Sequence, residues 1–264
     1  NKILYFNFKL KILHYVQILF FKNIKYNYLL IAGNYFKKKF INKNPYKTRI
    51  IDFNSWDYSK TLKPSKKYNN FFKNYIVFLD VPNPNYFNEN NLYGIKNSLD
   101  FNDWSDQLNN YFSFLQKKLK KEIVICPHPL TPADENYKKK FSKYKIIENQ
   151  TMELIKYSDL VVNVGSTALS YAVVFRKPIV LIYNQNIKET GLSYKTIQNL
   201  SVELNCKLLN IEIEDYKNID YSRIYSFDKK KYEIYTQEYL SCANIKKTNS
   251  EIISKLINKN ENLQ

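Results

Sequence analysis

The sequence predicts an α/β protein built on a doubly wound parallel sheet between residues 75 and 211. Short apolar runs rich in β-branched and aromatic residues alternate with segments that repeat apolar residues at helical spacing. The runs are continuously apolar, which is typical of strands that are buried on both faces. Strands of this kind that are separated by helices pair in parallel through right-handed crossovers. Six such runs make one complete doubly wound domain.

The first strand, helix and second strand follow one another directly. The run YIVFLD, residues 75–80, predicts a strand that the turn-rich VPNPN ends. A helix is expected over residues 100–121, because its large apolar residues recur three and four positions apart and lysines fill its last turn. The run EIVIC, residues 122–126, predicts the second strand, which leads into His128.

The remaining elements repeat this alternation. Thr151 is expected to cap one helix, and Gly165 permits a tight turn that opens another. Thr248 and Glu251 form the capping-box pattern of the last helix. The expected strands are residues 145–147, 160–164, 178–183 and 206–212, and the expected helices are residues 151–158, 165–175, 193–205, 231–243 and 248–259.

The chain is expected to divide into two regions. Residues 73–264 form a Rossmann-like C-terminal lobe that ends in helices. Residues 1–72 carry fewer elements, namely a long opening helix followed by the runs YLLIAG and TRIIDF, and they indicate a partial N-terminal lobe. Because the first residue is Asn1 and not Met, we expect a piece of a longer protein.

The composition excludes several classes of protein. A hydrophobic fraction of 44% and an aromatic fraction of 16% exclude a disordered tail, and 4 glycines and 8 prolines exclude a fibrous protein. The 3 cysteines lie far apart and match no zinc or disulfide pattern, which favours a reducing compartment and a cytoplasmic location.

The net charge of +17 has two interpretations. The lysines occur as scattered doublets and triplets, which is typical of a solvated surface, but the charge would also attract phosphate-bearing ligands and anionic membrane. Lysines interrupt the apolar opening segment well before the roughly 20 residues that a membrane span needs. That segment is expected to pack in a core or to lie on a membrane surface. No nucleic-acid recognition motif is present, so no specific nucleic-acid partner is expected.

Polar residues follow the ends of several predicted strands. In an open parallel sheet, ligands bind outside the carboxyl ends of the strands. Asp80 ends the first strand, His128 follows the second, residues 163–167 end the fourth, and Asn184 follows the fifth. We therefore expect several of these side chains to meet at one rim of the sheet.

The residues at this rim have both functional and structural interpretations. His128, fixed between two prolines, could donate a hydrogen bond to a phosphate or could bond a carbonyl in its own loop. Ser166 and Thr167 follow Gly165 and could bind a phosphate at a helix N-terminus or could cap that helix. No second histidine or carboxylate lies at ligand spacing, so no metal is expected.

The order of these features resembles a known family. The segments PHP, ENQTMELIKYSDLVV and GSTALSYAVVFRKPIVLIY look like the C-terminal lobe of GT-B glycosyltransferases that build bacterial surface polysaccharides. That group includes bacterial sialyltransferases, polysialyltransferases and capsule Kdo transferases, and CDP-glycerol glycerophosphotransferases have a related arrangement. His128 and Pro129 match its HP motif, and Ser166 and Thr167 match its Ser-Ser or Ser-Thr motif. The resemblance covers about residues 73–212.

This resemblance implies a GT-B-like glycosyltransferase of capsule or lipopolysaccharide synthesis. Such an enzyme would transfer a sugar from a CMP- or UDP-linked donor to a glycan or lipid-linked acceptor. With a CMP donor, the sugar would be an acidic one. It would work in the cytoplasm or against the inner face of the bacterial membrane. Residues 73–264 would be the donor-binding lobe and residues 1–72 the acceptor side. His128, Gly165, Ser166 and Thr167 would hold the donor phosphate without a metal or other cofactor.

Further nucleotide contacts are expected from three residues. Pro129 belongs to the HP motif, and Asn184 follows a strand at the same rim. Glu148 could bind a ribose hydroxyl or could be a solvated turn residue.

The catalytic base and the activity itself have alternatives. The acidic motif of the sialyltransferases is absent, so Asp52, Asp57 and Asp80 are candidates, and each could instead have a surface or capping role. Asp80 has the best position, at the end of a strand. The alternative functions are a UDP-sugar 2-epimerase-like enzyme of the same fold and a non-catalytic basic binding protein.

Overall fold

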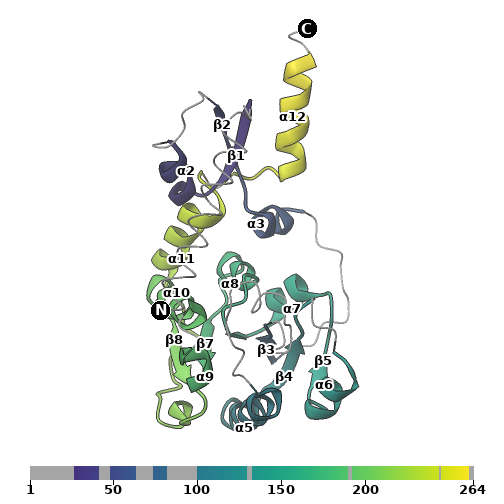
Figure 1. Cartoon of the computed structure of the whole chain (residues 1–264), viewed down its shortest axis with the longest axis vertical. Helices are drawn as coiled ribbons and strands as arrows, with labels where there is room; N and C mark the ends of the chain where they lie inside the picture. Colours follow the sequence, from purple (N-terminus) through teal and green to yellow (C-terminus); the bar gives the residue numbers. More distant parts are fainter. Residues whose placement is uncertain are drawn as a thin grey trace, which may run out of the picture.

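The computed structural model describes residues 27–41, 48–63, 74–81, 100–129, 133–189, 192–243 and 245–261. Among these residues, six parallel strands form one sheet in the order β5-β4-β3-β6-β7-β8 (Figure 1). Every neighbouring pair in this sheet is parallel. The strands are β3 (Tyr75–Leu79), β4 (Glu122–Cys126), β5 (Lys145–Ile146), β6 (Leu160–Asn163), β7 (Ile179–Tyr183) and β8 (Lys207–Asn210).

The strand order is that of a doubly wound sheet. From β3 the chain adds β4 and β5 on one side, then returns to the other side of β3 and adds β6, β7 and β8. The direction of growth therefore reverses between β3 and β6, and a crevice opens at the carboxyl ends of strands at such a point. The predicted fold class is confirmed as an α/β protein with a doubly wound, Rossmann-like C-terminal lobe.

Helices connect the strands of this sheet. Because the growth direction reverses, right-handed crossovers place α5 and α8 on opposite faces of the sheet (Figure 1). The helices of this lobe are α5 (Phe101–Leu119), α6 (Glu135–Lys140), α7 (Thr151–Tyr157), α8 (Leu169–Val174), α9 (Gln185–Glu189) and α10 (Leu192–Leu204).

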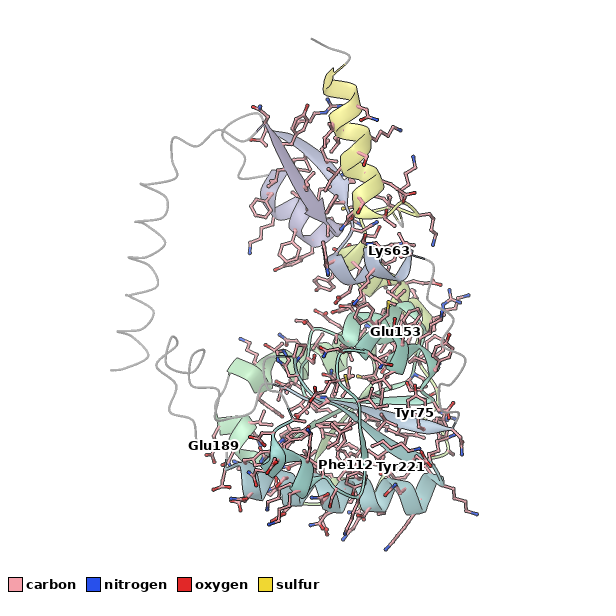
Figure 2. The ribbon with its side chains drawn as sticks, turned by 90° about the vertical axis from the view of Figure 1, so that its right-hand side faces the viewer. Lys63, Tyr75, Phe112, Glu153, Glu189 and Tyr221 are labelled. Carbon is pink, nitrogen blue, oxygen red and sulfur yellow. The ribbon has the colours of Figure 1, made fainter. Side chains whose placement is uncertain are left out.

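The core is centred on β3, whose residues are buried along the whole strand. Val77 lies opposite Val124 on one side and Val161 on the other. The apolar face of α5 packs against the sheet, and the rings of Phe78 and Phe112 are 5.1 Å apart. Figure 2 shows Phe112 beneath the sheet. Burial of each of these side chains contributes about 1.5–3 kcal/mol to the stability of the folded protein. This packing holds the strand ends in fixed positions.

Two helix starts differ from the sequence-based expectation. Thr151 is the first residue of α7 and not its cap, because Gln150 occupies the N-cap position without a side-chain hydrogen bond. The Thr151 hydroxyl lies instead 3.2 Å from the Cys126 Sγ at the end of β4. The helix α8 begins only at Leu169, because residues 166–168 form a turn before it.

A smaller parallel unit precedes this lobe. Its two described strands pair in parallel, with Tyr28 opposite Arg49, and they correspond to the expected runs YLLIAG and TRIIDF. The long helix expected before them lies outside the described residues. The elements of this unit are β1 (Tyr28–Ala32), α2 (Asn34–Ile41), β2 (Arg49–Phe53) and α3 (Trp56–Thr61).

The C-terminal segment returns to this smaller unit (Figure 1). The amide of Ser55 donates to the Leu240 carbonyl at 2.7 Å, and Asn54 forms an antiparallel bridge with Ser241. Gly33 also meets this segment. It has φ of 79°, and a Cβ there would lie 2.2 Å from the Glu238 carbonyl oxygen, so only glycine fits. The elements of the segment are η1 (Asp215–Lys217), α11 (Lys229–Tyr235), the π-helix η2 (Thr236–Leu240) and α12 (Asn249–Glu261).

The start of α12 fixes the start of α3. The Asn249 amide side chain donates to the Asn54 carbonyl at 3.0 Å and accepts from the Asn54 amide at 3.2 Å. The backbone amide of Asn249 donates to the Ser59 hydroxyl at 2.8 Å. The predicted capping box is confirmed, since the Thr248 amide donates to the Glu251 carboxylate at 2.6 Å and the Glu251 amide donates to the Thr248 hydroxyl at 3.3 Å. None of the helices that the structure describes is long and apolar enough to cross a membrane.

Asn249→Ala is expected to lower the free energy of unfolding by about 3 kcal/mol, because it leaves the buried amide and carbonyl of Asn54 without their partner. Urea unfolding followed by circular dichroism measures the loss. The matched control is Asn110→Ala on the exposed side of α5, which should change stability by less than about 0.5 kcal/mol. Equal effects of the two substitutions would contradict the anchoring role.

Candidate functional site

A cavity of about 320 Å³ lies at the carboxyl ends of β3, β4 and β6, at the reversal point of the sheet. Residues of α3 close it from the smaller unit. Figure 2 shows Lys63, two residues beyond the end of α3, above Glu153 of α7. The lining residues are Trp56, Asp57, Lys60, Leu79, Asp80, Cys126, Pro127, His128, Pro129, Asn149, Thr151, Ser166, Thr167, Ala168 and Tyr171.

The structure brings together Asp80, His128, Ser166 and Thr167, which lie up to 87 positions apart in the sequence. Pairing of β3 with both β4 and β6 puts their carboxyl ends side by side, so the residue that follows each strand reaches the same cavity. The roles of His128, Ser166 and Thr167 as donor-phosphate ligands and of Asp80 as the base stay predictions.

The imidazole of His128 reaches the cavity from the end of β4. Pro127 before it is buried, His128 is half-buried, and Pro129 after it is exposed at the cavity edge. Flanking prolines restrict the backbone of this segment, so little conformational freedom is lost when the ring is held against a ligand. The imidazole can donate a hydrogen bond in its neutral and in its cationic form.

The turn after β6 presents two hydroxyls. The buried Asn163 side chain holds the turn by accepting from the Gly165 amide and donating to the Ser166 carbonyl at 3.4 Å. Gly165 has φ of 98°, a conformation that strains other residues, and a Cβ there would lie 3.1 Å from Ile197. Gly165 thus shapes the turn without lining the cavity.

The hydroxyls of this turn do not cap α8 in the expected way. Ala168 holds the N-cap position without a side-chain hydrogen bond, and the Ser166 hydroxyl makes only a long contact of 3.4 Å with the Ala168 amide. Thr167 is exposed and Ser166 half-buried, and both line the cavity. The capping alternative is therefore met only by this one bond to Ser166, and both residues lie at the cavity where a ligand could reach them.

Asp80 is a buried carboxylate at the base of the cavity. Its Oδ2 accepts from the Tyr137 hydroxyl at 2.6 Å, and its Oδ1 accepts from the Val81 amide at 2.8 Å. Burial raises the pKa of Asp80 to about 6, because the charged form loses its hydration, and the two donors offset only part of this effect. The group can therefore hold or release a proton near neutral pH.

Asp57 is a second carboxylate on the opposite wall. It lies in the first turn of α3, and its carboxylate accepts a hydrogen bond from the Tyr171 hydroxyl of α8. Ser170, whose hydroxyl donates to the Thr167 carbonyl at 2.9 Å, lies beside it. Burial raises the pKa of Asp57, against the lowering effect of these donors and of the Lys60 ammonium. The third candidate, Asp52, does not line the cavity, and it pairs with Lys37 at 2.6 Å.

Two expected nucleotide contacts lie elsewhere. Glu148 is exposed and does not line the cavity, and its carboxylate accepts from the Ala133 amide at 3.0 Å. Asn184 is fully buried, bonds Gln107 at 3.0 Å and accepts from the Ile187 amide at 3.0 Å at the start of α9. The structure gives both side chains structural partners, and their proposed nucleotide contacts stay predictions.

Several lining residues were not singled out from the sequence. Trp56 follows β2 as the first residue of α3, so the strand-end rule would have selected it had β2 been treated like the strands of the large sheet. Lys60 lies in the last turn of α3 and gives no such signal. Asn149, with φ of 59°, precedes α7 and gives no such signal. No cluster of three metal-ligating side chains occurs among the residues that the structure describes.

Comparisons with known proteins add a structural likeness. No protein-family model matches the sequence, and no curated protein matches it. Among solved structures, the chain is similar to the crystal structure of Methanocaldococcus jannaschii UDP-GlcNAc 2-epimerase in complex with UDP-GlcNAc and UDP, with 16% identity and a TM-score of 0.46. The match covers 78% of this chain and 59% of that chain. The function proposed below therefore rests on the residues of the cavity.

We expect the wild type to become more stable relative to Asp80→Asn as the pH is lowered from about 7 to about 4. The folded pKa of about 6 lies above the ordinary value of 3.8, so the folded protein binds the proton more tightly. This contribution is fully present below pH 4, is lost as the pH rises through 6, and amounts to about 3 kcal/mol. Urea unfolding at several pH values measures it.

Tyr137→Phe is the matched control, because it removes a donor that lowers the Asp80 pKa while keeping the ring packing. It should move the midpoint of the pH dependence upward. A stability difference between wild type and Asp80→Asn that does not change with pH would contradict the assignment.

Proposed function

We propose that this chain is a nucleotide-sugar-dependent glycosyltransferase of bacterial surface polysaccharide synthesis, which binds the donor phosphate in the cavity at the sheet reversal point. The observation that carries the proposal is the convergence of His128 with Ser166 and Thr167 in one cavity. These residues also occur in the order of the HP and Ser-Thr motifs that the sequence resembles.

The chemistry of these groups suits the phosphate of a nucleotide. A phosphate is a strong acceptor of hydrogen bonds, and an imidazole and two hydroxyls are donors that come here from two rigid strand ends. In glycosyl transfer the bond between the sugar and the phosphate oxygen breaks, and negative charge develops on the nucleotide. Donors that are already in place stabilise this charge without reorganisation.

A carboxylate of the cavity supports the second half of the reaction. The acceptor hydroxyl must lose its proton as its oxygen bonds to the sugar carbon, and a base with a pKa near neutral can take it. Asp80, with a pKa of about 6, lines the same cavity as the phosphate-binding residues and serves as this base in the proposal. Asp57 on the opposite wall is the alternative base.

Isothermal titration with CMP and with UDP tests donor binding. We expect one of the two nucleotides to bind the wild type, and both His128→Ala and the double substitution Ser166→Ala with Thr167→Val to weaken this binding by about tenfold or more, because each removes hydrogen bonds to a charged phosphate. Ser142→Ala is the matched control, since Ser142 is exposed and does not line the cavity.

Two results would contradict the proposal. One is the absence of binding of either nucleotide to the wild type, and the other is an unchanged affinity in both cavity variants. If the chain transfers the sugar, the nucleotide will be released from its sugar donor only when a glycan is added. Conversion of the free donor without a glycan would indicate an epimerase instead.

A further inference from the structure

Trp56 is an exposed tryptophan at the wall of the cavity. Its side chain is 79% exposed, although the other tryptophan of the sequence, Trp104, is only 2% exposed. A large aromatic ring left in water forgoes the stabilisation that burial of its apolar surface would give. The ring lies at the first residue of α3 and lines the cavity that His128 and Ser166 enter from the other side. A ligand that fills this cavity would cover it.

The neighbours of Trp56 provide a hydrogen-bond donor and a hydrogen-bond acceptor. Lys60 is four positions further along α3, so the two side chains share one face of the helix. The exposed ammonium of Lys60 can only donate hydrogen bonds, while the Asp57 carboxylate accepts them. All three side chains line the same cavity.

The position of this face is fixed by the fold. Ser55 caps α3 by accepting from the Tyr58 amide at 3.2 Å. Ser59 accepts from the Asn249 amide, and the hydroxyl of Tyr171 in α8 donates to the carboxylate of Asp57. The indole is thus carried on an anchored helix, and little ordering is needed when a ligand binds.

We propose that Trp56, Asp57 and Lys60 form a carbohydrate subsite that binds a pyranose ring opposite the phosphate-binding residues. The indole face covers the apolar C–H face of the ring, Asp57 accepts from ring hydroxyls and Lys60 donates to ring oxygens. A sugar ring has both an apolar face and hydroxyls around its edge, and the subsite offers a matching surface to each. Assigning this ring to the glycan acceptor rests on the proposed transferase function.

A nucleobase is the competing occupant, since it also stacks on aromatic rings. The sugar is favoured because the proposed phosphate ligands all come from the large sheet, whereas the subsite comes from the smaller unit across the cavity. The edge of the subsite also combines a carboxylate with an ammonium, which suits a ring whose hydroxyls both donate and accept.

Intrinsic tryptophan fluorescence of the full chain tests the proposal directly. The probes are lactose, N,N′-diacetylchitobiose and glucuronic acid, each titrated at millimolar concentrations, and CMP and UDP alone. We expect at least one sugar to change the Trp56 emission saturably. Trp56→Ala should abolish this change and weaken binding of that sugar, measured by titration calorimetry, by about tenfold. Lys60→Met should weaken it by about threefold.

The controls separate this proposal from the donor-site proposal. Phe40→Ala removes an exposed aromatic ring that does not line the cavity, and it should leave the response to sugar unchanged. Because Trp56 is exposed, Trp56→Ala should keep the unfolding midpoint of the wild type and should bind CMP or UDP as the wild type does.

Two outcomes would overturn the subsite. The first is that no sugar of the panel changes the Trp56 emission, even if CMP or UDP binds and His128→Ala abolishes that binding. Loss of nucleotide affinity in Trp56→Ala, together with quenching by CMP or UDP alone, would assign the indole to the nucleobase. If neither nucleotide binds but the fluorescence response to sugar is intact, only the donor-site proposal is contradicted.

Discussion

Parallel pairing of β3 with β4 on one side and β6 on the other is the constraint on which the site depends. Residues of β3 pair in register with β4 and with β6, and β3 is buried along its whole length. None of the three strands can therefore shift without moving apolar side chains out of the core. Their carboxyl ends therefore stop at one rim. Asp80, His128 and Ser166 reach one cavity because each follows one of these ends.

The return of the C-terminal segment holds α3, which forms the opposite wall, in place. A short helix such as α3 has little stability of its own, and here Asn249 and Ser241 bind the residues at its start. The same contacts carry Trp56, Asp57 and Lys60 to the cavity. The chain thus builds its site between two units, one that holds the proposed phosphate ligands and one that faces them.

Burial of polar groups around the cavity lowers the stability of the folded protein. Asp80 loses its hydration and keeps only the Tyr137 hydroxyl and the Val81 amide as donors, so its pKa rises to about 6. A residue selected for stability alone would be uncharged here. A carboxyl group that titrates near neutral pH beside accessible hydroxyls is instead suited to proton transfer.

Continuous apolar runs and strand-end residues are local signals, and from the sequence alone they predicted the six strands, their parallel pairing and the rim where His128 and Ser166 meet. Local signals were insufficient for Thr151, which bonds Cys126 and not its own helix, and for Asn184, which is buried against Gln107. Only the tertiary structure placed Trp56 across from His128. That position depends on contacts between residues 54 and 249, which no pattern of neighbouring residues encodes.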